Sequence, residues 1–348
     1  MALMADRNPD IVLDLPNFPT EICTNIMDWG RSGYIATIFS SSVYLWHNNT
    51  DHIEEILNTR IPASRALRWN HAGNLLAVAN LRTLSVWSMS KNTQVLKKCF
   101  EHFGSYITGS ISVLAWDKKD KYVVTGSTNG YICVFDISGN QKKSLLEYIP
   151  GHGDTVMCLQ FCRSNRYLCS TGLDNNVRLW KWPSLQEHFE INYQTPVRAI
   201  AFHPWRDALL AVGGGVGEGS IALWNVCNYQ QIGYMKPEKE SFVDCLTWSP
   251  VTGELVSSHQ IADGDNGFKT KILVLAGLNR VVDTINEHTG RVLYMMWSPN
   301  GTKLGTAVSL QQLVHNILLS YLHTHTRKYS ITIDTCKYFV RQCCQMCL

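Results

Sequence analysis

Residues 151–180 read GHGDTVMCLQFCRSNRYLCSTGLDNNVRLW. Three short apolar runs in this segment are separated by turn residues, and each run has the length of one β-strand. The first run ends at Phe161, the second contains Ser170 and the third ends at Trp180. Their β-branched and aromatic residues suit a pleated, largely buried surface. The segment therefore predicts three consecutive strands.

The same pattern recurs along the chain at intervals of 40 to 49 residues, each time with an aromatic residue closing the first run: Trp29, Trp69, Trp116, Phe161, Phe202, Trp248 and Trp297. Strand-like repeats with a period in the forties are typical of β-propellers, in which each repeat is one blade. Repeated blades close one ring and do not split into separate cores. We therefore expect one all-β, seven-bladed propeller, although 348 residues alone suggest two domains.

The third strand of most repeats is also clear, as in Val43–Trp46, Leu84–Trp87, Ile132–Phe135, Val177–Trp180, Ile221–Trp224 and Ile272–Leu275. Propeller rings avoid an unpaired edge when a strand from the N-terminal region completes the last blade. The apolar segment Ile11–Leu15 suits that role. It is therefore the predicted ring-closing strand.

The seventh repeat departs from the pattern after its second strand. Where a third strand is expected, the apolar residues have helix-like spacing: Leu310, Leu313, Val314, Ile317 and Leu318. The sequence thus predicts an incomplete or irregular seventh blade without its own third strand. We expect an N-terminal segment with the closing strand at residues 1–24, the propeller at 25–309 and a divergent C-terminal tail at 310–348.

Composition narrows the class of protein. The formal net charge is +3 and no basic stripe stands out, which disfavours a nucleic-acid partner. The sequence contains no apolar stretch of about 18 residues for a membrane span. Twelve scattered cysteines and no leader peptide favour reduced thiols in the cytoplasm and nucleus. The tail has metal-ligating residue types without paired Cys-x-x-Cys spacing, so we expect no metal and no cofactor: His323, His325, Cys336, Cys343, Cys344 and Cys347.

No catalytic arrangement is convincing. Gly213–Gly219 resembles a phosphate-binding loop, but the strand-like segment Ser220–Trp224 follows it where such a loop needs a helix. His152 and Asp174 permit a catalytic or a structural interpretation. The structural one is favoured because a buried carboxylate must be paired and a histidine N–H satisfies it. We therefore predict no enzymatic activity.

The fourth repeat resembles the WD40 repeat. Its Gly151-His152 pair, Ser170, Asp174 and Trp180 match the residues that form a buried hydrogen-bond chain in that family. The resemblance implies the same structural chain here.

Longer strings resemble one particular family. Three strings of this sequence look like parts of the Fizzy, or cell division cycle protein 20, propeller: Leu13–Pro16, Asn25–Trp29, and Ala201–Trp205 with Gly213–Gly215. The divergence of the sequence from that family suggests its insect cortex branch. The resemblance covers about residues 11–308. It implies a substrate-recruiting activator of the anaphase-promoting complex, a ubiquitin ligase, in cell-cycle or meiotic control. The implied partners are subunits of that complex and degron-bearing proteins such as cyclins, with no nucleic acid and no membrane.

The resemblance also implies two substrate-binding places. Asn175 and Arg291 match family positions that contact Lys-Glu-Asn degrons. Asp14 and Pro16 match positions in the groove for Arg-x-x-Leu destruction boxes, with Asp14 facing the degron arginine. Polar turns or strand ends are the alternative interpretation of these four residues.

Other family positions depart from the pattern. Leu173 replaces an Asn, Val216 a Thr and Cys23 a Tyr, which weakens or alters the Lys-Glu-Asn pocket. The family's second acidic groove residue is expected on the missing third strand of the seventh blade.

Two docking elements of the family, the C-box arm and a terminal Ile-Arg, are not found in this sequence. The alternatives to the activator are therefore a shortened isoform that does not dock on the ligase and a generic WD40 interaction scaffold.

Overall fold

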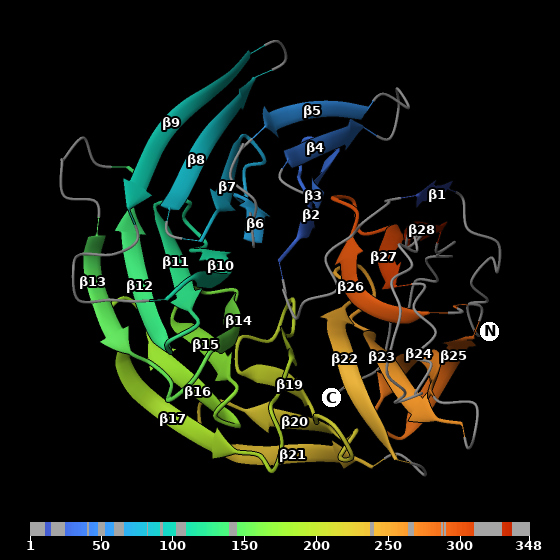
Figure 1. Cartoon of the computed structure of the whole chain (residues 1–348). Helices are drawn as coiled ribbons and strands as arrows, with labels where there is room; N and C mark the ends of the chain where they lie inside the picture. Colours follow the sequence, from blue (N-terminus) through green and yellow to red (C-terminus); the bar gives the residue numbers. More distant parts are fainter. Residues whose placement is uncertain are drawn as a thin grey trace, which may run out of the picture.

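The computed structural model describes residues 11–14, 25–39, 42–47, 53–58, 66–81, 83–90, 93–101, 109–138, 145–236, 240–263, 268–286, 288, 290–309 and 329–335. These residues form seven antiparallel sheets of four strands each, arranged as blades around one axis (Figure 1). Six blades use four consecutive strands. The seventh combines strands from both ends of the chain.

The blades are numbered by the chain order of their innermost strands. Blade one contains β2 (Met27–Trp29), β3 (Tyr34–Phe39), β4 (Ser42–His47) and β5 (Ile53–Asn58). Blade two contains β6 (Ala66–Trp69), β7 (Leu75–Ala79), β8 (Thr83–Ser90) and β9 (Thr93–Glu101). Blade three contains β10 (Ile111–Trp116), β11 (Tyr122–Ser127), β12 (Tyr131–Asp136) and β13 (Leu145–Pro150). Blade four contains β14 (Val156–Phe161), β15 (Tyr167–Gly172), β16 (Asn176–Lys181) and β17 (Gln186–Asn192).

Blade five contains β18 (Ala199–Phe202), β19 (Leu209–Gly213), β20 (Ile221–Asn225) and β21 (Gln230–Met235). Blade six contains β22 (Ser241–Trp248), β23 (Leu255–Ala262), β24 (Phe268–Gly277) and β25 (Arg280–Ile285). Blade seven contains β26 (Arg291–Trp297), β27 (Lys303–Ser309), β28 (Tyr329–Thr335) and β1 (Ile11–Asp14).

The innermost strand of each blade contacts that of the next, and β26 contacts β2, so the ring is closed (Figure 1). Each of the seven aromatic residues that define the repeat is the last residue of an innermost strand. The expected third strands coincide with β4, β8, β12, β16, β20 and β24. The all-β propeller fold predicted from the repeat is therefore confirmed.

The core lies between blades because each sheet is covered on both faces. In β10, Leu114 and Trp116 pack in a cluster with blade two, whereas Val113 and Ala115 pack in a cluster with blade four. Successive strand residues point to opposite faces. A strand buried on both faces therefore appears as a continuous apolar run. Phe135, with 0% of its surface exposed, contributes about 2 kcal/mol of hydrophobic stabilisation by burial.

The first and second strands of each blade are joined at what we call the lower end of the ring, and there the turns connect neighbouring blades. Asp120 and Asn165 adopt positive φ angles of 55° and 60° in these turns. The Asp120 carboxylate accepts hydrogen bonds from the backbone N–H groups of His71 and Ala72 in blade two. Asn165 likewise accepts one from the Lys118 N–H in blade three. Polar residues that tolerate the left-handed conformation thus also connect blades.

Blade seven is closed from the N-terminal side, as the sequence predicts. β1 pairs antiparallel with β28 from Ile11↔Ile333 to Asp14↔Ser330, and β28 pairs with β27. The predicted closing strand is therefore present at Ile11–Asp14, while Leu15 lies outside the described residues.

The expectation that blade seven lacks a third strand is wrong, because β28 occupies that position. The blade is nevertheless irregular. Its third strand begins 20 residues after Ser309, the end of its second strand. The segment with helix-like spacing and the tail histidines and cysteines named above lie outside the described residues.

Candidate functional site

The upper end of the ring, where the second and third strands of each blade are joined, is the candidate binding face. In blade four His152, from the β13–β14 connection, meets Asp174, from the β15–β16 turn. Connections between blades therefore lie at the same end as these turns. Because every blade repeats this strand order, Asn175 and Arg291 both belong to the upper end.

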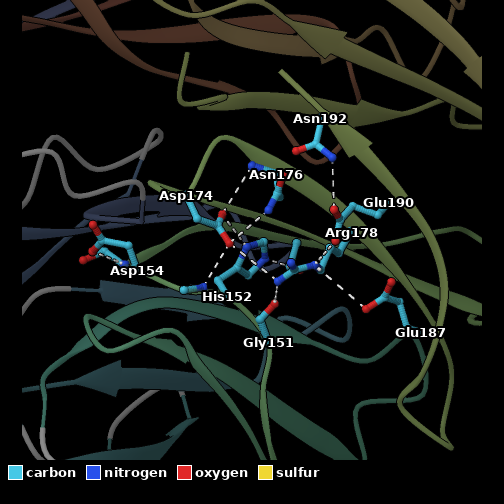
Figure 2. Close-up of polar contacts among 12 residues, drawn as sticks. Gly151, His152, Asp154, Asp174, Asn176, Arg178, Glu187, Glu190 and Asn192 are labelled. Carbon is cyan, nitrogen blue, oxygen red and sulfur yellow. Dashed lines mark hydrogen bonds and ion pairs between the residues drawn. The ribbon is translucent and has the colours of Figure 1, made fainter. Parts of the chain in front are cut away.

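Blade four contains a continuous hydrogen-bond chain, and Figure 2 shows the end of it at which His152 meets Asp174. Trp180 Nε1–H donates to Ser170 Oγ at 2.8 Å, and Ser170 Oγ lies 2.7 Å from His152 Nε2. His152 Nδ1 lies 2.9 Å from Asp174 Oδ1. The Gly153 N–H donates to Asp174 Oδ2 at 2.9 Å. The four residues singled out in the sequence are thus joined from the core to the turn.

Burial sets the protonation of this chain. Burial lowers the pKa of His152 and outweighs the opposing effect of the Asp174 carboxylate. Burial alone raises the pKa of Asp174, but hydrogen bonds from the Gly153 N–H and His152 bring it below its usual value. At neutral pH a neutral His152 therefore donates from Nδ1 to an ionised Asp174 and accepts at Nε2 from Ser170.

This arrangement is structural in character. The His152 side chain is 0% exposed and both of its ring nitrogens are engaged. Arg178 encloses the pair by donating to the Gly151 carbonyl and, at 2.6 Å, to Glu190 (Figure 2). A substrate at the surface therefore does not reach His152.

Arg291 begins β26 and is held by a carboxylate of blade six. Its Nε lies 2.9 Å from Asp244 Oδ2, and its Nη2 lies 2.6 Å from Asp244 Oδ1. The guanidinium also lies over the Phe242 ring, 4.8 Å from the ring centroid. Asp244 is 2% exposed and Arg291 33% exposed. The buried carboxylate thus orients a partly exposed guanidinium, whose Nη1 has no hydrogen-bond partner among the described residues.

A second cation adjoins the same carboxylate. Arg198 Nη1 lies 3.6 Å from Asp244 Oδ1. Two guanidinium groups and one carboxylate leave a formal charge of +1 beside the axis of the ring. Such a site favours a carboxylate ligand, because guanidinium groups bind carboxylates with charge-assisted hydrogen bonds.

Asn175 lies in the β15–β16 turn with a φ of 65°. Its Nδ2 donates to the Gln194 carbonyl at 3.3 Å, a long hydrogen bond that leaves the side chain partly exposed. No contact is recorded between Asn175 and Arg291, which belong to blades four and seven. They are separate groups on one face, and a peptide that uses both must lie across it.

The WD40 family model, described as WD domain, G-beta repeat, matches residues 94–136 and 143–181. A protein named cell division cycle 20.4, cofactor of APC complex, from Arabidopsis thaliana is 30% identical over 321 residues, covering 88% of this chain and 68% of that protein. The chain belongs to the cell division cycle 20 (Fizzy) family.

Other family members are similarly distant. The WD repeat-containing protein slp1 of Schizosaccharomyces pombe is 28% identical, covering 88% of this chain and 61% of that protein. Protein cortex of Heliconius melpomene is 27% identical, covering 88% and 70%. These identities are too alike to assign a branch of the cell division cycle 20 family.

A solved structure shows the same fold. A chain of the crystal structure of the mitotic checkpoint complex matches with a TM-score of 0.77 and 23% identity, over 95% of this chain and 93% of that one. At this identity the match supports the propeller fold alone.

Within this cell division cycle 20 family propeller, two departures from the family pattern lie at the upper end. Val216, in the β19–β20 turn, is 68% exposed. Leu173 is half-buried, and its N–H donates to the Thr155 carbonyl at 2.9 Å. Neither apolar side chain replaces the hydrogen bonds of the Thr and Asn that the resemblance implies. Cys23 lies outside the described residues.

The destruction-box residues are only partly described. Asp14 is the last residue of β1 and pairs with Ser330, while Pro16 lies outside the described residues. Asp334 is the acidic residue of β28, four positions beyond Ser330. At about 3.3 Å per residue, its backbone lies roughly 13 Å along the strand from that pair.

Sequence reasoning missed Asp244 and Arg198. The signal was an acidic residue inside the apolar run Val243–Leu246, because a carboxylate buried in a strand needs a cationic partner.

Other kinds of site are not supported by the described ranges. They contain no group of three His, Cys, Asp or Glu residues arranged to hold a metal ion. In the same part of the chain, no helix is long and apolar enough to cross a bilayer.

Proposed function

We propose that this protein is a substrate-binding cofactor of the anaphase-promoting complex in cell-cycle or meiotic control. The main support is the 30% sequence identity, over 88% of this chain, to a protein named as a cofactor of that complex. Its role is binding and not catalysis, because its relatives are WD-repeat proteins named as cofactors or as a subunit of the complex.

The upper end supports recognition of Lys-Glu-Asn segments. Arg291 is fixed by Asp244 and Phe242, so little side-chain freedom remains to be lost when a peptide binds. Its Nη1 offers N–H donors to the degron glutamate. Asn175 offers an amide to the neighbouring polar groups, although Leu173 and Val216 reduce the number of hydrogen bonds available.

The proposed destruction-box groove lies between the last and first blades, on the side where β1 completes blade seven. Asp14 supplies the carboxylate for the degron arginine.

Each contact is small, and ordering a disordered substrate costs free energy, so each degron binds weakly alone. Two degrons on one chain raise the effective concentration of the second and strengthen binding without new contacts. Substrates with both degrons, such as cyclins, are therefore the preferred class.

Peptide titration tests the first site. A fluorescein-labelled Lys-Glu-Asn peptide is titrated with the wild type and with Arg291→Gln, Asn175→Ala and the exposed control Arg166→Gln. We expect R291Q and N175A to weaken binding and R166Q to leave it unchanged. Arg291→Glu is avoided because it sets a carboxylate against buried Asp244 and endangers the fold.

A thermal melt of each variant separates lost contacts from lost structure. Equal affinity of the folded R291Q variant and the wild type would remove Arg291 from the site.

Co-purification distinguishes the cofactor from a generic WD40 scaffold and from a form that does not dock. The tagged protein is expressed in dividing cells, and subunits of the complex are sought with and without an added family C-box arm. Recovery of subunits supports the cofactor, and recovery only with the arm supports the non-docking form. Recovery of neither subunits nor degron peptides leaves the scaffold.

We also propose that the protein works in the cytoplasm and nucleus, where that ligase and its substrates meet. Imaging of a fluorescent fusion through the cell cycle tests this, and confinement to a membrane compartment contradicts it.

A further inference from the structure

Blade six carries a hairpin that is longer than its neighbour. β23 and β24 have 8 and 10 residues and remain paired from Leu255↔Leu275 to Ala262↔Phe268. The second and third strands of blade five, β19 and β20, have 5 residues each. The upper part of the hairpin therefore extends beyond the blade that covers its lower part.

The register identifies which face is left open. Leu273 and Leu275 pack with Ala199, Ala211 and Ile221 of blade five. Above them, β23 and β24 pair His259 with Lys271 and Ile261 with Lys269. Alternate residues of a strand share a face. Blade five covers only the lower part of this face of the hairpin. The upper part of the same face therefore carries Lys269, Lys271, His259 and Ile261.

A cleft of about 720 Å³ lies on this face. We call it the blade-six cleft and define it by Lys236, His259, Ile261, Lys269, Lys271 and Val281. Met235 and Lys236 form its wall on the blade-five side, where β21 ends. This volume is within the range of sites that hold a ligand or a few peptide residues.

The cleft is positively charged. Among the residues that the structure describes, Lys236, Lys269 and Lys271 line it together with one acidic residue, Asp263. None of the three lysines forms an ion pair with a carboxylate in the described ranges. His259 adds no charge at neutral pH, because burial lowers its pKa to about 4 and its Nε2 lies 3.0 Å from Ser257 Oγ.

The floor and wall of the cleft are apolar. Ile261 and Leu273 are half-buried, and Val281 is 51% exposed. Three lysine side chains around an apolar surface are complementary to a peptide segment whose carboxylates flank an aliphatic side chain. A free phosphate does not use the aliphatic surface, and the described lining of the cleft includes no arginine for a bidentate phosphate contact.

We propose that the blade-six cleft binds an extended acidic peptide segment with an aliphatic anchor residue. Lys236, Lys269 and Lys271 contact its carboxylates, and Ile261, Leu273 and Val281 contact its anchor. This site lies apart from Arg291 and from the β1–β28 edge, and it goes beyond the proposed degron sites.

The probe is a fluorescein-labelled peptide of sequence Asp-Glu-Ile-Glu-Asp-Leu, titrated into the full chain. One control peptide replaces the acids with their amides, and a second replaces Ile and Leu with Ser. We expect saturable binding of the probe, weakening with added salt, and much weaker binding of both controls.

Two variants locate the binding. Lys269→Glu with Lys271→Glu should weaken it about tenfold or more, because two ion pairs become like-charge contacts. Val281→Ser should weaken it about threefold through the anchor alone. The matched control is Lys119→Glu with Lys181→Glu, which makes the same change in net charge at exposed positions of blades three and four and should leave binding unchanged.

Equal binding by K269E/K271E and wild type overturns the proposal, as does an equal loss in the control pair. Full competition by inorganic phosphate, with no effect of V281S, reveals an anion site and also overturns it. Because Lys-Glu-Asn binding is titrated separately on the same variants, failure here is distinguishable from failure of the proposed function.

Discussion

Blades four and seven complete a four-stranded sheet in opposite ways. Blade four is built from consecutive strands, from Val156 to Asn192, and its turn is fixed by the His152–Asp174 pair. Blade seven joins β26 and β27 to β28, which begins 20 residues after Ser309, and to β1 from the N-terminal region. Its histidine, His288, lies 3.4 Å from Thr306 Oγ1, a longer contact than that of His152 with Ser170.

The two blades are therefore held in their folded arrangement by different interactions. In blade four a buried polar chain specifies the turn locally, and every donor has an acceptor. In blade seven the order comes from pairing across the sequence, because β1 and β28 are held in the sheet by ladders between distant segments. Pairing of distant segments costs more loop-closure entropy than pairing of consecutive strands. Blade four should therefore be sensitive to loss of single polar groups and blade seven much less so.

The largest effect is expected when the carboxylate of blade four is removed. Asp174→Ala leaves the neutral His152 without the acceptor of its Nδ1–H and the Gly153 N–H without its own, and it should lower the free energy of unfolding by about 3 kcal/mol. His288→Ala in blade seven should cost about 1 kcal/mol, because His288 is half-buried whereas His152 is buried. Urea unfolding of both variants gives the comparison. Exposed Asp154, replaced by Ala, is the control in the same loop, and equal losses for D174A and H288A would contradict the distinction.

Acid should act next, through buried neutral histidines such as His259 in blade six. Its folded pKa of about 4 is below that of the unfolded chain, so the unfolded state binds more protons as the pH falls below about 6.5. The stabilisation is present above that pH and is lost on acidification. Between pH 7 and about pH 4.5 this histidine alone should remove about 2 kcal/mol.

Urea unfolding across this pH range measures the effect, and His259→Gln should flatten the profile. Superimposable pH profiles for H259Q and wild type would show that His259 does not titrate in this way.

A matched pair of hydroxyl deletions sharpens the comparison. Ser170→Ala leaves Trp180 Nε1 and His152 Nε2 without partners and should cost about 2 kcal/mol. Thr306→Val, which keeps the shape of the side chain in blade seven, should cost about 1 kcal/mol. Thermal and urea unfolding of the two variants test the order, and a larger loss for T306V reverses it.

The smallest effect concerns the outside of blade four. Glu190→Gln weakens the 2.6 Å ion pair with Arg178. The Arg178 side chain is 18% exposed and the Glu190 side chain is 30% exposed. Such partly exposed pairs contribute little, so the loss should be below about 1 kcal/mol and should shrink in high salt. A loss as large as that of S170A would place Arg178 inside the essential polar chain.

The propeller was predictable because its signals are local and repeated. The aromatic residue that closes each innermost strand and the His, Ser, Asp and Trp of blade four lie within single repeats. The closing strand at Ile11–Asp14 was also predictable, since a ring needs one and this segment is apolar. Strand β28 was missed although Ser330–Ile333 alternates polar and apolar residues, because it follows a long segment with helix-like spacing.

The candidate site was less predictable for a physical reason. Arg291 and Asp244 lie 47 residues apart, one blade step, and their pairing depends on how two sheets face each other. A single sequence shows that a carboxylate inside a strand needs a partner, but not which of several arginines approaches it. The blade-six cleft depends likewise on the relative lengths of two neighbouring hairpins.

The pairing of β1 with β28 has a consequence during protein synthesis. Chains are made from the N-terminus and fold as segments emerge from the ribosome. Blades one to six have all their strands once Ile285 has left the ribosome. Strand β1, in contrast, pairs only after Tyr329–Thr335 has left it. For that interval β1 has no partner in the ring, and the nascent protein presents an open strand edge to chaperones and to other chains.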